Sequence, residues 1–297
     1  MSKEKRELDR REIIKVVTKN DFIVAEGLAK LSLNARKLLY LAIAQCRKND
    51  VEFYEYSTTP SDLAEMWGIS RQRVYQKADE ITDELMMMFI KIKPKGKKFK
   101  KYQLFEYCEY DDDSMVTFKI SADMARLFLK INGDFTQPPL SQFMKMRSKY
   151  SMAIWHLMQR EMGSRLPGVT APIEFDLTLE ELRKVTDTQD KFKLTGHFKE
   201  RVLNQAIKEI KENLLADITY TDLKRGKKIT GFRFTASNVF GNLNAEELTL
   251  RERQIVRKAE LIRKKSDGTI TAEELIELQK LKEILYQMRI EDYYREY

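Results

Sequence analysis

Two segments of the chain combine arginine, lysine and amide side chains at helical spacing. The first, 71–78, reads RQRVYQKA, and the second, 199–206, reads KERVLNQA. Arginine can donate to O6 and N7 of guanine. Asparagine or glutamine can pair with N6 and N7 of adenine, and each such contact gives about 1–3 kcal/mol of discrimination. These residue types therefore predict two helices that read base edges in DNA.

The side chains available for this role are those on the outer side of each helix, opposite its buried apolar face. In the second segment Phe198, Val202, Ala206 and Ile210 recur at helical spacing and are expected to be buried. The candidate base readers are Lys199, Arg201, Asn204, Gln205 and Lys208 on the second helix, and Arg71, Gln72, Tyr75 and Gln76 on the first. Most single basic helices are solvated amphipathic faces, so the recurrence of the pattern is what favours DNA reading.

Each helix is followed by a basic turn around one glycine, at 95–98 (KGKK) and at 225–228 (RGKK). Beside a recognition helix, a basic hairpin tip would form the wing of a winged helix and contact phosphates. The alternative for either tip alone is an ordinary soluble hairpin end. The candidate phosphate contacts are Arg73, Lys77, Lys95, Lys97, Lys98, Lys191, Lys193, His197, Lys224, Arg225, Lys227 and Lys228. For the three that precede the second helix, 191–197, a solvated loop is an equal alternative.

The helical segment and the basic turn recur in the same order at nearly the same spacing, which indicates a duplicated domain. The predicted fold class is α+β, with two tandem winged-helix domains related by internal duplication and a C-terminal helical hairpin. The expected boundaries are a charged N-terminal arm at 1–20, a first domain at 21–131, a linker at 132–140, a second domain at 141–240 and a helical tail at 241–297.

Local signals place the elements of the first unit. An apolar helix is expected at 31–46 and a strand at 51–56. Thr59, followed by Pro60, should cap a short helix that stops at Gly68. Ser70 can cap the helix after it, with Val74, Ala78, Ile81 and Leu85 facing inward. Strands are expected at 88–93 and 100–110.

The second unit repeats this plan with a helix at 144–160 and strands at 173–177, 216–221 and 229–236. Thr178 and Glu181 fit a capping box at the start of the short helix. Two helices are expected in the tail, at 245–265 and 271–294.

Composition limits the classes of protein to consider. The chain has 297 residues and a net charge of +8, and all of the positive excess lies before residue 241, which favours a polyanionic partner. Cys46 and Cys108 cannot form a disulfide framework and are expected to be reduced. The N-terminus lacks the apolar stretch of a signal peptide, and apolar runs such as 85–90 are too short to span a bilayer. We therefore expect a soluble, cytoplasmic protein.

The motifs of enzymes are absent from the sequence. It contains no phosphate-binding loop of the GxxxxGK[ST] type, and no cysteine or histidine spacing suits zinc. His156 and His197 are too far apart in the sequence for a metal-binding cluster, and His156 is expected to pack at the edge of the core. We expect no cofactor, no metal and no catalytic residue. A rolling-circle nicking enzyme, which would need a metal and a nucleophilic tyrosine, is a distant alternative.

Further residues resemble a known family. They are LNARKLL at 33–39, SKYS at 148–151, IWHL at 154–157 and FKERVL at 198–203, with Ala206, Glu209 and Ile210 after them. From about 16 to 240 the chain resembles the initiator Rep proteins of iteron-controlled plasmids. Phe192 and Trp155 stand where that family usually has tyrosine.

The resemblance implies that the C-terminal winged helix dominates contact with directly repeated origin DNA. It also implies that the N-terminal domain assists DNA binding in monomers and mediates dimerisation. Monomers would open the origin and recruit the host replication initiator and the replicative helicase, and dimers would repress the initiator's own gene. Two alternatives remain: a winged-helix transcriptional repressor without an initiator role, and an interaction scaffold that uses the tail hairpin.

Overall fold

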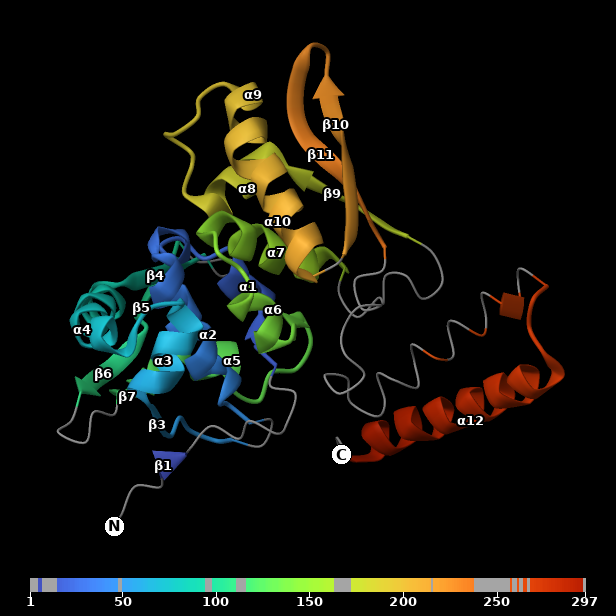
Figure 1. Cartoon of the computed structure of the whole chain (residues 1–297), viewed down its shortest axis with the longest axis horizontal. Helices are drawn as coiled ribbons and strands as arrows, with labels where there is room; N and C mark the ends of the chain where they lie inside the picture. Colours follow the sequence, from blue (N-terminus) through green and yellow to red (C-terminus); the bar gives the residue numbers. More distant parts are fainter. Residues whose placement is uncertain are drawn as a thin grey trace.

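The computed structural model describes residues 5–6, 15–47, 50–93, 98–110, 116–162, 172–214, 216–237, 257, 261, 264–265 and 268–295. Within these ranges the chain forms two winged-helix domains. In Figure 1 the first domain, in blue and teal, lies below the second, in yellow and orange, and a long helix lies to the right of both.

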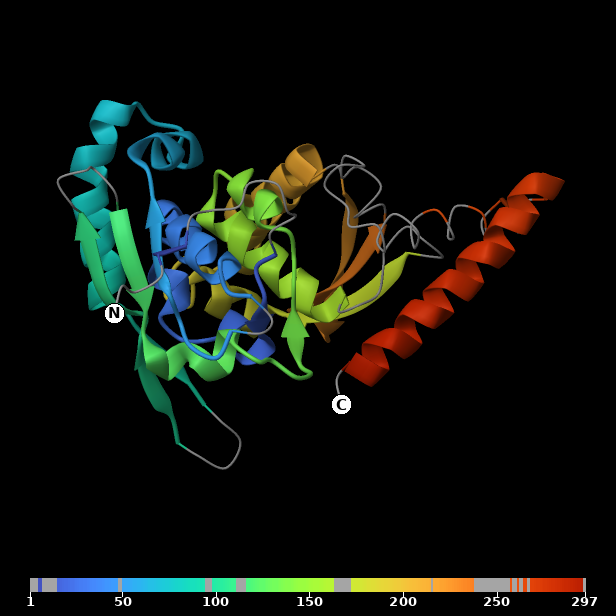
Figure 2. The ribbon, with the colours of Figure 1, turned by 90° about the horizontal axis from the view of Figure 1, so that it is seen from below.

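The first domain begins with two helices, α1 (Asn20–Ile23) and α2 (Leu33–Ala44). Strand β3 (Glu55–Thr58), helix α3 (Pro60–Trp67) and helix α4 (Arg71–Met87) follow. A hairpin of β4 (Phe89–Ile92) and β5 (Lys100–Gln103) then forms the first wing, and β6 (Phe105–Tyr110), β7 (Val116–Ile120) and α5 (Ala125–Phe128) complete the domain. Figure 2 shows α4 along one edge of the molecule.

The predicted start positions of α3 and α4 and the predicted stop of α3 are confirmed. The Thr59 hydroxyl accepts a hydrogen bond from the Asp62 amide at 3.1 Å, and Gly68 ends α3 at a φ of 66°. This left-handed backbone suits glycine because it has no Cβ. Ser70 is the N-cap residue of α4, as predicted, but its side chain makes no cap hydrogen bond.

The strand predicted at 100–110 is two strands in two sheets. β5 pairs with β4, whereas β6 pairs with β7 in a sheet of order β1-β3-β7-β6, in which β1 is Lys5–Arg6. The break falls at Leu104, which is fully buried together with Phe105. Two adjacent buried side chains interrupt the alternation of a half-exposed strand, and the chain changes sheet there. The strand predicted at 51–56 begins only at Glu55.

The second domain contains α7 (Lys149–Met162), β9 (Ile173–Thr178) and α8 (Leu179–Thr186). A long helix made of α9 (Thr195–Phe198), η3 (Lys199–Leu203) and α10 (Asn204–Leu214) follows, and β10 (Asp217–Arg225) and β11 (Lys228–Ser237) form the second wing. The three strands pair in the order β10-β11-β9. The capping box of Thr178 and Glu181 is confirmed, with both of its hydrogen bonds present.

The helix predicted at 144–160 is also two elements, α6 (Leu140–Met144) and α7. Glu209 of α10 binds the chain around the start of α7: its carboxylate accepts hydrogen bonds from the Arg147 amide and the Ser151 hydroxyl. A carboxylate at a helix start is stabilising because it satisfies backbone donors and opposes the positive end of the helix dipole.

The domains meet at a buried polar group around His156 of α7. Its Nδ1 lies 2.8 Å from the Tyr40 hydroxyl of α2, and its Nε2 lies 3.3 Å from Thr18 Oγ1 and 3.4 Å from Thr136 Oγ1. Burial, with a smaller contribution from the Arg36 charge, lowers the pKa of His156 to about 3. The imidazole is therefore neutral, and it lies inside the core rather than at the predicted edge.

Thr18 and Thr136 belong to two short paired strands, β2 (Thr18–Lys19) and β8 (Phe135–Thr136). The last residues of the predicted charged arm and part of the predicted linker are thus folded together, and Val16 is fully buried. One contiguous hydrophobic core runs through both domains.

The tail contains α12 (Ala272–Arg295). Leu278 and Leu281 of α12 pack with Leu261, and Arg257 makes two hydrogen bonds of 2.9 Å to the Glu277 carboxylate. The helix predicted at 245–265 lies mostly outside the described residues. No helix in the described ranges has the length and apolar character needed to cross a membrane.

Candidate nucleic-acid interface

The second candidate recognition helix runs without a break from Thr195 to Leu214 beside the wing (Figure 1). Its predicted inward face, Phe198, Val202, Ala206 and Ile210, is buried as expected. Leu203 and Ile207 are buried as well, so this helix inserts more deeply into the core than its sequence pattern indicated.

The middle of this helix, η3, is a π-helical turn in which the Asn204 amide donates to the Lys199 carbonyl, five residues back. The apolar side chains from Phe198 to Leu214 recur every four residues. In an α-helix that spacing drifts by about 40° at each step, because each residue turns about 100°. A wider π turn absorbs part of this drift and keeps the side chains on one side. The strict four-residue spacing was thus a sequence signal for the π turn.

The helix α4 of the first domain has the contrasting pattern. Its buried residues Val74, Ala78, Ile81 and Leu85 alternate spacings of four and three, which follow the α-helical period, and α4 is α-helical throughout.

The outward side of the second helix presents Arg201, Gln205 and Lys208 to solvent. Lys208 lies 3.8 Å from Glu212 in an exposed ion pair, which is too weak to hold it away from a ligand. Arg201 and Gln205 make no hydrogen bond or ion pair with the described residues. These three side chains therefore remain candidates for contact with bases.

Two further predicted base readers, Lys199 and Asn204, bind side chains of the wing, although Asn204 remains exposed. Lys199 Nζ lies 2.7 Å from Asp222 Oδ1 of β10, and both side chains are about three-quarters buried. Asn204 Oδ1 accepts a hydrogen bond from the Tyr220 hydroxyl, also of β10. The structure thus separates these two residues from Arg201, Gln205 and Lys208.

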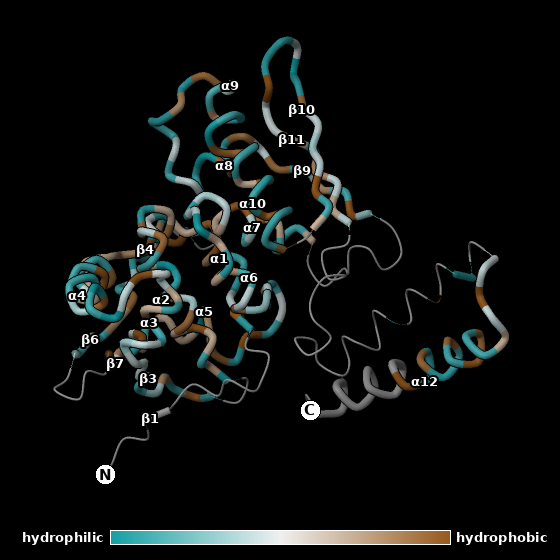
Figure 3. The backbone as a smooth tube through the Cα atoms, viewed as in Figure 1, coloured by the Kyte–Doolittle hydropathy of each residue, from teal (hydrophilic) through white to brown (hydrophobic). Residues whose placement is uncertain are grey.

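The second wing has an aromatic base and a basic tip. The Tyr220 ring packs on Phe232 and Phe234, and Phe175 of β9 stacks on Phe234 at 5.5 Å between ring centres. Beyond a register shift at Leu223/Lys224 the hairpin reaches an exposed, hydrophilic turn (Figure 3). The structure places all four predicted phosphate contacts of this tip on that exposed turn: Lys224, Arg225, Lys227 and Lys228.

The loop before the recognition helix is held by Arg183 of α8, a residue that sequence reasoning missed. Its guanidinium donates to the carbonyls of Thr188, Lys191 and Phe192, each at 2.8 Å. It also lies 4.9 Å from the centre of the Phe198 ring, and burial lowers the pKa of the guanidinium. Phe192 has a φ of 51°, a strained conformation that these bonds help to maintain.

This loop carries the remaining predicted phosphate contacts of the second domain. Lys193 and His197 are exposed, and Lys191 is exposed with its ammonium 3.6 Å from Asp187. Arg183 therefore connects the basic loop to the buried side of the recognition helix.

The first recognition helix, α4, presents Arg71, Gln72, Arg73 and Gln76 to solvent at its N-terminal half. Tyr75 is also exposed, but its ring lies edge-on to Tyr110 of β6. Lys77 forms an exposed ion pair with Glu80. At the first wing, Lys98 is exposed, whereas Lys95 and Lys97 lie outside the described residues.

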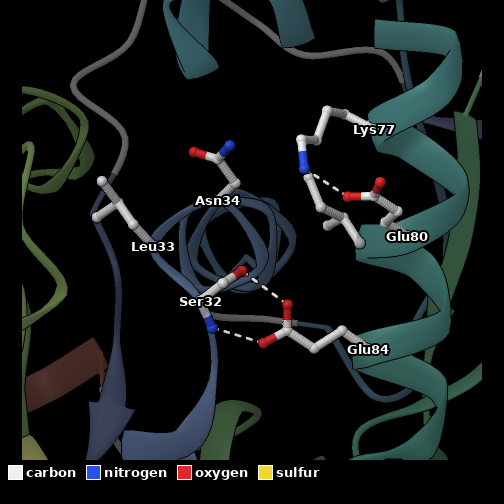
Figure 4. A pocket seen from close by; sticks show the side chains of 7 residues that line it. Ser32, Leu33, Asn34, Lys77, Glu80 and Glu84 are labelled. Carbon is white, nitrogen blue, oxygen red and sulfur yellow. Dashed lines mark hydrogen bonds and ion pairs between the residues drawn. The ribbon is translucent and has the colours of Figure 1, made fainter. Parts of the chain in front are cut away.

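Glu84 of α4 makes the same kind of contact as Glu209 in the other domain. Its carboxylate accepts hydrogen bonds from the Ser32 amide and from the Ser32 hydroxyl, at 2.5 Å and 2.7 Å, at the start of α2 (Figure 4). A hollow of about 380 Å³ lies beside this contact, between α2 and α4. Because Glu84 already neutralises the start of α2, the hollow is not arranged to take a phosphate.

The two domains therefore share a feature that the sequence comparison did not show. In each, a glutamate of the recognition helix accepts hydrogen bonds at the start of a core helix, α2 or α7. In the described residues, no group of histidine, cysteine, aspartate or glutamate side chains could hold a metal ion.

Comparison with known proteins supports this description of the fold. A solved structure, the Pi initiator protein in complex with iteron DNA, superposes with a TM-score of 0.65 at 20% sequence identity, covering 76% of this chain and 98% of that one. The search of curated proteins gave no match.

Two family models match the chain directly. The model of the initiator replication protein domain WH1 matches residues 15–159, and that of the initiator Rep protein domain WH2 matches residues 178–236. Together they account for more than half of the sequence, in the order of the two winged helices, and the first match extends into α7. The chain therefore belongs to the initiator Rep protein family.

Proposed function

We propose that the protein is a plasmid replication initiator that binds directly repeated origin DNA, the iterons, through its two winged helices. The observation that carries the proposal is the second domain: Arg201 and Gln205 are solvent-facing on a recognition helix, with the basic wing tip at 225–228 on one side and the basic loop at 191–197 before it. Arginine and amide groups supply base contacts, and the flanking lysines supply phosphate contacts.

The first domain adds a second contact on the same chain. Two recognition helices on one DNA face would enter major grooves about one helical turn apart. Binding of the first raises the effective concentration of the second, which increases affinity without any new contact. The likeness to the Pi initiator, whose structure holds iteron DNA, supports this arrangement.

The finer steps are also part of the proposal. Bound monomers would promote opening of the origin and recruit the host replication initiator and replicative helicase, and a dimer in equilibrium with the monomer would repress the initiator's gene. These steps rest on membership of the initiator Rep family. They require binding energy rather than a catalytic step, and they place the protein with plasmid DNA in the cytoplasm.

The test is binding of the full chain to the repeats beside its own gene and to shuffled duplexes of equal length, across a salt series. We expect a preference of about a thousandfold or more for the repeats, with protection of two adjacent major grooves per monomer. Equal affinity for both DNAs, lost together as salt rises, would mean charge attraction alone and would reject the proposal. Specific binding without replication of a plasmid that carries the repeats would favour a repressor.

A further inference from the structure

The second wing holds the π turn of the recognition helix at both of its ends. Lys199 is the first residue of η3 and Asn204 follows its last residue. The side chain of Lys199 is fixed by Asp222, and that of Asn204 by Tyr220, two positions apart on β10. The Asn204 amide also donates to the Lys199 carbonyl, so the two anchored residues are the two ends of one π-helical hydrogen bond.

The anchors on β10 are themselves rigid. Tyr220 packs on Phe232 and Phe234 of the neighbouring strand. The Lys199 ammonium lies 5.6 Å from the centre of the Tyr220 ring and 5.8 Å from that of Phe232, so it also gains cation–π contact. Three kinds of contact therefore connect η3 and the residue after it to the wing: an ion pair, a hydrogen bond and a cation–π contact.

The π turn decides where Arg201 points, because Arg201 lies inside it. A π turn contains one residue more than the α turn it replaces, and one residue corresponds to about 100° of rotation around the helix. If η3 returned to α-helical form, the side chains before it would rotate by about that amount relative to Gln205 and Lys208 on α10, and Arg201, in the middle of the turn, would rotate by part of it. The three outward side chains would then no longer face one groove together.

We propose that Asp222 and Tyr220 are positioning residues that set base specificity by holding η3 in its π-helical form. The inference rests on the proposed DNA binding and deepens it. The wing strand would then have two separate functions. Its tip would contact phosphates, whereas its base would align the reading side chains, in particular Arg201. Because α4 is α-helical throughout, this device belongs to the second domain.

The experiment uses full-length protein and duplexes selected by the wild type from a pool with about 25 randomised base pairs, enough for two adjacent major grooves. Affinities for a selected duplex and for the unselected pool are measured for Asp222→Asn and Tyr220→Phe. We expect the ratio of the two affinities to fall by about tenfold for Asp222→Asn and by severalfold for Tyr220→Phe. Affinity for the unselected pool should be retained.

The matched control is Asp176→Asn. Asp176 accepts two hydrogen bonds from Arg233 on the same sheet, at 2.8 Å and 2.9 Å, so the variant removes the same charge and a more exposed ion pair without touching the recognition helix. Its affinity ratio should equal that of the wild type. Tyr220→Phe keeps the ring and its packing, so it tests the idea even if Asp222→Asn fails to fold.

To distinguish alignment of Arg201 from a purely structural role of the wing residues, each variant is combined with Arg201→Ala. If the wing acts by aligning Arg201, Asp222→Asn should cause no further loss of discrimination in the Arg201→Ala background. Additive losses, equal losses on both DNAs, or an unchanged ratio in both wing variants would each overturn the inference. If the wild type enriches no sequence from the pool, the proposed function fails instead.

Discussion

The guanidinium of Arg183 lies 4.9 Å from the centre of the Phe198 ring and donates to the carbonyls of the loop just before it. One side chain thus packs on the buried side of the recognition helix and also shapes the basic loop at its start. Arginine suits this position because its planar group can stack and donate several hydrogen bonds at once.

Replacing Arg183 by lysine should disorder the loop while keeping the charge. A lysine cannot reach three carbonyls in one plane, so we expect a loss of about 1–3 kcal/mol in the free energy of unfolding. Faster hydrogen exchange of the amides at 188–193 is the direct measurement. Lys184→Met, one position along the same helix, is the control. Equal exchange rates in Arg183→Lys and wild type would contradict the assignment.

Arg201 and Lys227 should affect DNA binding in different ways. Arg201→Ala is expected to lower affinity for the target repeats by about tenfold or more while sparing random DNA, because base contacts carry the discrimination. Lys227→Ala should weaken binding to both DNAs and reduce the slope of log affinity against log salt by about one, since one phosphate contact is lost. Both are read from titrations at several salt concentrations. Equal losses on both DNAs for Arg201→Ala would refute its role.

The two capping glutamates should contribute similarly to stability. Glu84→Gln and Glu209→Gln each lose charge-assisted hydrogen bonds to the start of a core helix, so we expect each to cost about 1–3 kcal/mol in denaturant unfolding. Glu212→Gln removes only an exposed ion pair with Lys208, 3.8 Å away, and should change stability by less than about 0.5 kcal/mol. The interpretation fails if all three variants unfold at the same denaturant concentration.

The burial of His156 predicts that the folded protein loses stability as the pH falls. Its pKa is about 3 in the folded protein, whereas an unfolded histidine has a pKa of about 6.5. Below pH 6.5 the unfolded state therefore binds a proton that the folded state does not. Stability should fall by up to about 1.4 kcal/mol per pH unit as the pH drops from about 6.5 toward 3.

The measurement is the free energy of unfolding at several pH values between 6.5 and 5, above the range where most carboxylates titrate. His156→Gln should show a smaller slope than the wild type. Tyr40→Phe removes the hydroxyl that contacts Nδ1 but keeps the histidine, so it should be less stable at every pH with the slope retained. A His156→Gln slope equal to that of the wild type would show that His156 is not the group that takes up the proton.

The sequence by itself determined the two winged helices, and the reason is that their signals are local. The buried stripe from Val74 to Leu85 follows helical periodicity, and the capping box of Thr178 and Glu181 spans only three residues. The same holds for the exposed wing tip around Gly226, which needs only a turn and its neighbours.

Only the tertiary structure decided which of the outward side chains have partners within the protein. Lys199 and Asn204 share the outward pattern of Arg201 and Gln205 in the sequence, but their partners Asp222 and Tyr220 lie 23 and 16 residues away on another element. Helical periodicity separates inward from outward positions. It contains no information about which polar group of another element the fold brings next to an outward side chain. Distant pairing also explains Glu84 and Glu209, whose roles depend on serines 52 and 58 residues away.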